Sequence, residues 1–527
     1  MSSRPIDQLL FRPSIPIPVA MDLLIGLDVG TTGCKCSVFD EDGTPLCSAY
    51  REYPLICPKP AWAELDPKQV WQSITEAIGE ALSRLEHPPE AVKSLAVSSQ
   101  GEAFMPISRE GEPLHNSIVT PDQRAQVQTE ALRDLFGARW LFEETGMVLF
   151  PIYTLNKILW LRDNRPKVFE KTDRFLCWED FVNFKLTGNA VIDHSLANRT
   201  LMFDIHNRRW SGEILDELDL DCDLLALPAP SGQEVGEVTP NAARETGLSP
   251  GTSVATGGHD QACGCLGAGV TDPGPVYDVT GTVECLIPSI HEPVLTEPIF
   301  EGGYGNYCHV VPERYLILGY NMTAGSILRW FRDEFAQEEV RRAGEEGRPV
   351  YALLDEMAES IPPGSEGALM LPYFMGAATP NWDTNARGTL TGLTLAHGKG
   401  HIVRAIMEGI TYELRRNIES LRSAGIGAQE IRTVGGGAAS SFWCQLKADI
   451  TGLPVHVPSI PEASSLGAAL LAGIGSGTYG SHREAVKRTY EVSRVHTPSP
   501  CEGYEDGYAN YKKLYDRLAP LFPELSG

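Results

Sequence analysis

The chain has 527 residues, and 44 basic against 69 acidic side chains give it a formal net charge of −25. This length is enough for two or more domains and for a large core that needs no disulfide or metal to fold. The acidic balance argues against general affinity for nucleic acid or for anionic membranes, because both need clustered Lys and Arg. We therefore expect neither as a partner, although a local basic pocket for a small anion is compatible with this charge.

The 12 cysteines are scattered along the chain, which is typical of a cytoplasmic protein. Two Cys-x-Cys pairs, Cys34/Cys36 and Cys263/Cys265, would each place both thiols on one face of an extended strand. A metal-binding pair is one interpretation, and small buried side chains are the preferred one. Prolines interrupt residues 1–20, which we expect to be an N-terminal extension and not a signal peptide.

Strand and helix patterns alternate from the start of the chain. The apolar run 23–27 predicts a strand, which leads through Asp28 and a Gly/Thr turn into a second strand at 35–40, so a β-hairpin is expected. A helix over 70–86 and a strand over 94–98 follow. This alternation predicts an α/β fold.

A second hairpin of the same kind is predicted over 276–286. Asp-Val-Gly-Thr-Thr marks the first hairpin and Asp-Val-Thr-Gly-Thr the second. Either the match is chance, or an ancient duplication produced two domains with similar cores. The Gly- and Pro-rich stretch 264–275 is a suitable domain boundary.

Two helices are predicted late in the chain. A strand over 431–434 runs into Gly435–Ala438, after which Ser440 or Ser441 caps a helix to about residue 450. Such a helix start after a glycine turn suits an anion or a nucleotide. The uncharged run 463–482 is too rich in glycine for a membrane span and predicts a buried helix with small-residue packing.

Standard nucleotide-binding, zinc-protease, EF-hand and hydrolase motifs are missing from the sequence. Three Gly/Thr/Ser turns remain, at 28–35, 280–282 and 435–438, and each could present backbone N–H groups to phosphate. Each alone is compatible with an ordinary tight turn, but three in one acidic α/β chain favour a nucleotide site. An acidic protein can hold ATP where backbone amides and Mg²⁺ neutralise the phosphates.

Asp28 and Asp260 both follow apolar strands. An aspartate beside glycines is often only a turn former. The functional interpretation gives one of them to Mg²⁺ and the other to a substrate hydroxyl.

At this point the sequence resembles the FGGY carbohydrate kinases, from about Asp22 to Phe522. The resemblance rests on motifs that follow one another in the family's order: Gly26–Thr32, Ala61–Pro67 with Trp71, Asp122–Ala125, Thr154–Asn164, Gly388–Leu393, His401–Glu408 and Gly435–Asp449. Ile152 departs from the first position of one family signature.

The resemblance implies an α/β fold of two actin-like (ribonuclease H-like) ATPase domains with a cleft between them. The expected division is an extension at 1–20, an N-terminal domain at 21–268, a C-terminal domain at 269–515 and a tail at 516–527. It also implies an ATP- and Mg²⁺-dependent kinase that transfers a phosphoryl group in line to a terminal hydroxyl of a small sugar or polyol.

The resemblance further implies a role for each matching residue. Asp260 matches the catalytic base and Asp28 the Mg²⁺-holding residue. The implied nucleotide contacts are Gly30, Thr31, Thr32, Thr280, Gly281, Thr282, Gly325, Gly436, Gly437 and Ser440. The implied substrate contacts are Gln100, Glu102, Asp122, Arg124, His259 and Gln261.

The loop after strand 94–98 bears on the substrate. Xylulokinases usually show Q-M-H-G in this loop, and glycerol kinases show Q-R-E. This chain has Gln100-Gly101-Glu102, which is closer to the Q-G-D-G of erythritol kinases. In addition, Thr120 stands where the family usually has an aromatic residue two positions before Asp122. A carboxylate at 102 suits a neutral polyol or ketose and disfavours a sugar acid, unless Glu102 points to solvent. A ketopentose such as xylulose is the first candidate substrate, and an erythritol-like polyol is the second.

Two other functions stay open from the sequence. One is a catalytically silent, sugar-sensing pseudokinase, and the other is an actin-like chaperone ATPase. The presence of both Asp28 and Asp260 argues against the first, and the substrate-side motifs argue against the second. A homodimer is compatible with the sequence, but no surface signal for one can be read.

Overall fold

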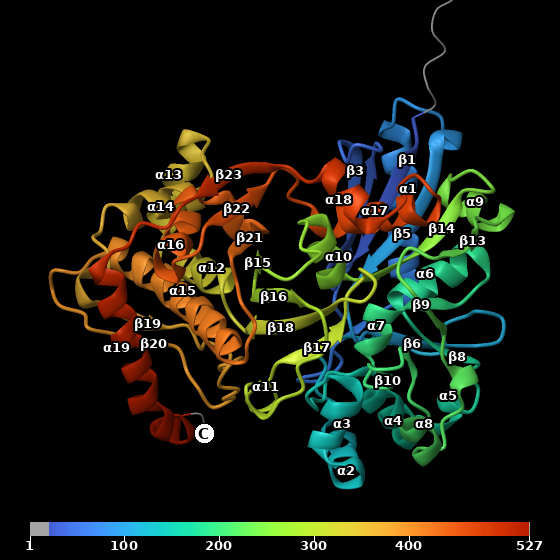
Figure 1. The fold of residues 1–527 in the computed structure, drawn as a ribbon, viewed down its shortest axis with the longest axis horizontal. Helices are drawn as coiled ribbons and strands as arrows, with labels where there is room; N and C mark the ends of the chain where they lie inside the picture. The colour runs from blue at the N-terminus through green and yellow to red at the C-terminus, as the bar shows by residue number, and fades with distance from the viewer. Residues whose placement is uncertain (1–20, 526–527) are drawn as a thin grey trace, which may run out of the picture.

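The computed structural model describes residues 21–525, so the predicted extension at 1–20 lies outside the described residues. The chain forms two lobes, each built around its own β-sheet with helices packed on it (Figure 1). The first lobe, at the right of the figure, carries the blue and green N-terminal half, and the second carries most of the yellow and orange C-terminal half. The predicted two-domain α/β organisation is confirmed.

The first lobe is built on a six-stranded sheet in the order β13-β14-β5-β1-β2-β3. β1 and β2 form the predicted antiparallel hairpin, and β5 and β14 run parallel to β1. Central strands such as β1 are apolar over most of their length because both faces of the sheet are covered. The strands are β1 (Leu23–Val29), β2 (Gly33–Phe39), β3 (Pro45–Glu52), β5 (Val92–Ser99), β13 (Glu234–Glu237) and β14 (Ser253–His259).

The second lobe is built on a seven-stranded sheet in the order β17-β18-β16-β15-β21-β22-β23. From β18 to β23 its neighbours pair antiparallel, antiparallel, parallel, parallel and antiparallel, which is the series from β3 to β13 in the first sheet. A shared core therefore explains the two similar hairpins better than chance does. The strands are β15 (Pro275–Thr280), β16 (Glu284–Ile290), β17 (Gly305–Cys308), β18 (Tyr315–Asn321), β21 (Glu430–Val434), β22 (Val455–Pro458) and β23 (Val492–His496).

Helices cover both sheets. In the first lobe α1 packs on β2 and β3, while α6 packs on β5 and β14; in the second lobe the long helix α15 packs on α14, α16 and β18. These helices are α1 (Pro67–Arg84), α6 (Trp178–Thr187), α14 (Val350–Glu359), α15 (Lys399–Ser423) and α16 (Ser441–Thr451). Other elements near the sites below are β4 (Glu64–Leu65), β6 (Phe104–Ile107), β7 (Ser117–Ile118), α4 (Thr154–Asn164), β8 (Arg174–Cys177), β9 (Val191–Asp193), α7 (His194–Asn198) and α12 (Gly325–Phe335).

The C-terminal segment folds back onto the second lobe. α19 (Glu502–Leu518) is followed by a helical turn at Ala519–Leu521 and by α20 (Phe522–Leu525). Phe522 is only 1% exposed and packs in an apolar cluster with α12, α15 and α16. The predicted tail is therefore anchored to the second lobe through Phe522.

One helix of the C-terminal half packs on the first sheet. The predicted small-residue helix is α17 (Ala463–Gly475), and it lies against β1, β5, β14 and α10 (Asp260–Gly267). A Cβ on Gly467 would stand 1.9 Å from the Cys263 carbonyl oxygen, and one on Gly26 would stand 1.7 Å from that of Ser465. Only glycine permits such close backbone approach. Because β1 leads to Asp28 and α10 begins at Asp260, this packing positions both predicted catalytic carboxylates.

The two Cys-x-Cys pairs differ in structure. Cys34 and Cys36 lie on strand β2 as expected, but Cys263 and Cys265 lie in helix α10, so the strand assumption was wrong for the second pair. All four thiols are free and buried, and burial raises the pKa of each. The preferred interpretation as small buried side chains fits these surroundings. Among residues 21–525, no helix is both long and apolar enough to cross a membrane.

Candidate active site

Three parallel strands of the first sheet end side by side. Val29 of β1 pairs with Ser99 of β5, and Ser99 in turn pairs with His259 of β14. The residues at these ends, Asp28, Gln100 and Asp260, are therefore brought to one edge of the sheet. Ligands of open α/β sheets bind at such carboxyl ends.

The two aspartates share a partly buried environment. Asp28 accepts a hydrogen bond from the Ser98 hydroxyl at 2.8 Å, and 30% of the Asp260 side chain stays exposed. Burial raises the pKa of Asp28. Burial also raises the pKa of Asp260, to about 7, with a further contribution from the negative charge of Asp28. Two carboxylates that disfavour each other's ionisation form a site that a divalent cation would stabilise.

His259 and Gln261 hold Asp260 from either side along the chain. The Gln261 backbone N–H donates to Asp260 Oδ1 at 2.6 Å, and His259 Nε2 lies 3.2 Å from the same oxygen. Burial holds the pKa of His259 well below its usual value, so its ring is neutral. A neutral imidazole can orient the carboxylate without pairing off its charge.

The first phosphate loop is held by Gln100. Its side-chain amide donates to the Gly30 carbonyl at 2.9 Å and accepts from the Thr31 hydroxyl at 3.1 Å. Tyr53 also donates to the Gly30 carbonyl, at 2.6 Å. The residue predicted to touch substrate thus visibly positions the loop, and its contact with substrate stays a prediction. Thr32 is exposed at the tip of the loop.

The second and third glycine turns meet in the other lobe. β15 and β21 run parallel and pair as far as Val279 and Val434, so both turns leave the same sheet edge. A Cβ on Gly435 would stand 2.8 Å from the Thr280 carbonyl oxygen, and one on Gly437 would stand 2.7 Å from the Thr280 Cβ. The structure therefore brings the predicted nucleotide residues of this lobe together.

Two helices start at these turns. The Gly325 N–H, at the start of α12, donates to the Gly281 carbonyl at 3.0 Å. Ser440 caps α16 by accepting a hydrogen bond from the Trp443 N–H at 2.9 Å, so of the two predicted cap residues, Ser440 and Ser441, the first is the cap. Gly281, Thr282 and Gly436 are exposed. The Gly281 N–H already donates to the Val283 carbonyl at 2.8 Å, so the backbone N–H groups that can reach a ligand at these turns are those of Thr282 and Gly436.

Glu102 is buried at the other end of the first lobe's site. It is 2% exposed, so the alternative that it points to solvent is wrong. Its Oε1 accepts from Arg199 Nε at 2.6 Å and also contacts Arg199 Nη2, and Oε2 accepts from Thr120 at 3.1 Å. Its φ of 58° lies in the left-handed region, which costs a non-glycine residue conformational energy. Strain, burial and charge pairing at one residue are typical of a functional position.

Asp122 and Arg124 bind each other beside it. Asp122 is fully buried and accepts from Arg124 Nε at 2.9 Å and from the Ala63 N–H at 2.6 Å. The Arg124 guanidinium lies 3.9 Å from the centre of the Trp62 ring, a cation–π contact. Protein partners occupy both Asp122 oxygens and the Nε and Nη2 atoms of Arg124, and the contact of these side chains with substrate stays a prediction.

Comparison with known proteins decides the family. The N-terminal domain model of the FGGY family of carbohydrate kinases matches residues 23–267, and the C-terminal domain model of that family matches residues 276–476. The chain belongs to the FGGY family of carbohydrate kinases. Membership of this family makes it a carbohydrate kinase.

Its relatives within the family are named for different substrates. This FGGY kinase is 31% identical to the xylulose kinase of Bacillus subtilis over 95% of this chain and 98% of that one. It is 29% identical to the gluconokinase of the same organism, over 95% of each chain. The structure of a ligand-bound xylulose kinase from Lactobacillus acidophilus covers 96% of this chain and 100% of its own, with a TM-score of 0.86 and 26% identity. The two-domain actin-like fold is thereby confirmed.

Sequence reasoning missed two residues of this FGGY kinase. One is Arg199, the partner of Glu102. The other is Lys447 on α16, which is 1% exposed and contacts Asp278 at 2.5 Å, Glu284 at 2.9 Å and the Thr280 hydroxyl at 2.5 Å. Neither belongs to a glycine turn or follows a strand end, so no local signal marks it.

The Thr280 hydroxyl points into this buried group. Thr280 is 1% exposed and bonded to Lys447, so only its backbone faces the turn. Lys447 thereby joins the helix capped by Ser440 to the hairpin of the second phosphate loop.

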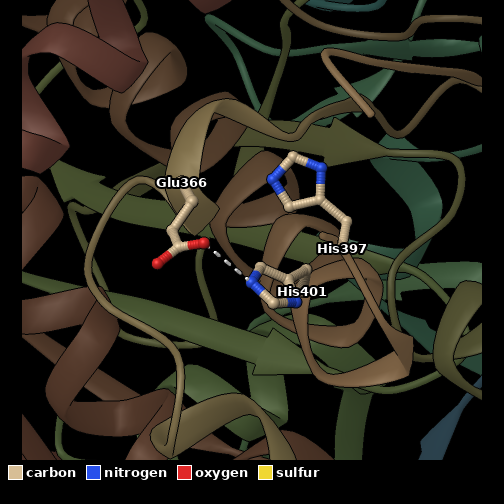
Figure 2. A group of neighbouring side chains, drawn as sticks. All are labelled: Glu366, His397 and His401. Carbon is tan, nitrogen blue, oxygen red and sulfur yellow. Dashed lines mark hydrogen bonds and ion pairs between the residues drawn. The ribbon is translucent and has the colours of Figure 1, made fainter. Parts of the chain in front are cut away.

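One histidine cluster with metal-ligand residue types lies outside the predicted site, at Glu366, His397 and His401. Figure 2 shows Glu366 bonded to His401, with the His397 ring beside them. Nδ1 of His397 accepts the Thr394 N–H at 2.8 Å, and Nδ1 of His401 accepts the Gly398 N–H at 3.1 Å. Each neutral ring therefore carries its proton on Nε2, and His401 Nε2 donates to Glu366 at 3.2 Å. In each ring, Nδ1 uses its electron pair to accept a hydrogen bond and Nε2 carries a proton, so neither nitrogen has an electron pair free for a metal ion. The cluster therefore fits the start of a helix and not a metal site.

Proposed function

We propose that this FGGY kinase transfers the γ-phosphoryl group of ATP to a terminal hydroxyl of a small sugar or polyol. A ketopentose such as xylulose is the leading candidate, with an erythritol-like polyol next. The observation that carries the proposal is the meeting of Asp28, Asp260 and the first phosphate loop at one sheet edge. The names of similar proteins, among them the xylulose kinase of Bacillus subtilis, support a small sugar as the substrate class.

Asp260 is proposed as the base. Its carboxylate is held by the Gln261 N–H and by neutral His259, and it stays partly exposed, so a substrate hydroxyl can reach it. Phosphoryl transfer has a loose transition state, and the hydroxyl loses its proton late. A weak base that orients the hydroxyl is therefore sufficient, and a pKa of about 7 keeps Asp260 half ionised near neutral pH.

The nucleotide is proposed to lie between the two lobes. Gly30, Thr31 and Thr32 would contact its terminal phosphates from the first lobe. Turns 280–282 and 435–437, with Gly325 and Ser440, would contact the rest from the second lobe. The division of labour follows the predicted boundaries: the domain at 21–268 binds sugar and carries the base, and the domain at 269–515 binds nucleotide.

Asp28 would hold Mg²⁺. Its carboxylate has one hydrogen bond from Ser98 and lies near the second carboxylate, Asp260, which suits a hard divalent cation. When bound, the ion supplies positive charge that offsets the phosphate oxygens.

The test is ADP release from ATP and Mg²⁺ against a panel of ketoses, polyols and aldoses. Turnover of at least one of them supports the proposal. Tight binding of a sugar without any turnover would instead support the silent sensor. Turnover stimulated only by unfolded peptides would overturn the assignment of a sugar site.

A further inference from the structure

Six charged side chains are buried together around Glu102. Each is at most 8% exposed, and they comprise three acids and three bases: Glu64, Glu102, Asp122, Arg124, Lys157 and Arg199. They come from β4, α4, the residue that follows α7 and the loops after β5 and β7. Burying so many charges is costly unless each is paired.

The pairing within this group is complete in charge. Arg199 bonds Glu102, and Arg124 Nη2 bridges Asp122 at 2.7 Å and Glu64 at 2.8 Å. The third base is Lys157, whose Nζ donates to the Val119 carbonyl at 2.9 Å. Burial lowers the pKa of Lys157 to about 8, against the charges of Glu102 and Asp122, so this side chain is mostly protonated at pH 7. Three negative and three positive charges therefore balance before any substrate binds.

The Arg199 guanidinium is not open to a substrate anion. Its charge is directed at Glu102, and its centre lies 5.6 Å from the Tyr153 ring and 5.4 Å from the Tyr307 ring. Nη1 points at the Met147 sulfur, 3.5 Å away. Arg124 Nη1 has no partner among the described residues, but two carboxylates already offset the charge of that side chain.

Glu102 still has capacity to accept hydrogen bonds. Both bonds from Arg199 fall on Oε1, whereas among residues 21–525 Oε2 accepts only from the Thr120 hydroxyl, at 3.1 Å, and that hydroxyl lies closer to the Gly101 carbonyl, at 2.6 Å. A carboxylate oxygen can accept two hydrogen bonds, so Oε2 can take one from a substrate hydroxyl. Glu102 is also near enough to Asp260 for its charge to act there, so it lies on the substrate side of the proposed base.

We propose that the Arg199–Glu102 ion pair makes this kinase select uncharged polyhydroxy substrates and exclude sugar acids. The inference rests on the proposed sugar kinase function and adds the residue pair that sets its substrate class. A neutral ketose or polyol leaves the six charges balanced. A sugar acid adds one negative charge to a buried site that already faces Asp28 and Asp260, and Arg199 is already paired.

This reason differs from the one drawn from the sequence. A bare carboxylate at 102 was expected to repel a sugar acid, but the structure pairs that carboxylate with Arg199. Discrimination between neutral substrates and sugar acids then depends on both Glu102 and Arg199. Removing the Glu102 carboxylate alone should shift the preference toward sugar acids.

The test uses the full chain and three variants: E102Q, R199Q and the double variant. ADP release is measured with xylulose, erythritol and D-gluconate, at fixed MgATP. We expect the unmodified enzyme to use a neutral substrate with kcat/KM at least tenfold above that for gluconate. E102Q leaves Arg199 as an unpaired buried cation, so its ratio of gluconate to neutral-substrate kcat/KM should rise at least tenfold. The double variant should lose that gain.

R199Q tests the pair from the other side and stays informative if E102Q does not fold. It leaves Glu102 unpaired, so KM for the neutral substrate should rise and gluconate should be used even less. The KM for ATP should change less than twofold in all variants, which a general loss of structure would not allow. R139Q is the matched control, because Arg139 pairs with Glu297 at the surface, and its sugar kinetics should not change.

The outcomes separate this inference from the proposed function. Preference of the unmodified enzyme for gluconate, or no gain in E102Q, would overturn the role of the pair while leaving a sugar kinase. Absence of turnover with every sugar would overturn the proposed function itself.

Discussion

Replacement of Asp260 by Asn tests the proposed base most directly. Asn keeps the size of the side chain and one oxygen that can still accept the Gln261 N–H, now 2.6 Å from Asp260 Oδ1. The variant loses the negative charge of the carboxylate and with it the ability to take a proton. General-base contributions are about 10²–10⁴ in rate, or about 2.7–5.4 kcal/mol of activation free energy.

The assay is ADP release at saturating sugar and MgATP, at about pH 8, where a group with a pKa of about 7 is mostly ionised. We expect kcat to fall by about two to four orders of magnitude while the KM for ATP holds. In the unmodified enzyme, kcat/KM for sugar should fall as the pH drops below about 7, because Asp260 becomes protonated. The residual kcat/KM of D260N should not show this fall at low pH.

Exposed Asp216 supplies the control, and Asp216→Asn should behave as the unmodified enzyme. A D260N rate within about tenfold of the unmodified enzyme at pH 8 would refute the reasoning, since that loss is below the range for a general base. An unchanged pH profile in D260N would refute it as well.

Three further predictions concern the supporting structure. Lys447→Met leaves the buried carboxylates of Asp278 and Glu284 without their cation, so the free energy of unfolding in urea should fall by about 3–5 kcal/mol. The KM for ATP should also rise in steady-state kinetics, and unchanged stability would contradict the prediction. Gly435→Ala should raise the KM for ATP, because its φ is 80° and the added Cβ would meet a backbone oxygen of the second loop, whereas Gly452→Ala, with φ of 70° and open space, should only lower stability. Burial raises the pKa of Glu179 and Asp193, so the folded state binds more protons than the unfolded state above their usual pKa values. These two groups therefore lower the free energy of unfolding as the pH rises above their usual pKa values, so between about pH 5 and 8 its slope should be more positive in Asp193→Asn than in the unmodified protein, and an equal slope would count against it.

Local patterns were enough to predict the parts that rely on backbone chemistry. Both hairpins, the Ser440-capped helix and the small-residue helix 463–475 were predicted close to their observed bounds. Each depends on residues that are neighbours in the chain: a glycine turn, a helix cap or a run of small apolar side chains. The second Cys-x-Cys pair shows the limit, because a short apolar stretch does not distinguish a strand from a helix.

The charged pairs could not be predicted in this way. Glu102 and Arg199 are 97 residues apart, and Lys447 and Asp278 are 169 apart. No spacing rule connects such positions, since only the tertiary structure brings the end of α7 to the loop after β5 and α16 to strand β15. The sequence singled out Glu102 as a candidate substrate contact, which stays a prediction, but it gave no sign of the partner Arg199.

The sequence by itself determined the family, the alternating α/β organisation and the three glycine turns, because these depend on local backbone requirements and on the order of motifs along the chain. The tertiary structure decided which side chains are paired. It placed Asp28 and Asp260 at one sheet edge through the packing of α17 on the first sheet, and it neutralised Glu102 with Arg199. The physical reason is that the energy of a buried charge depends on which groups surround it, and the fold alone brings those groups together.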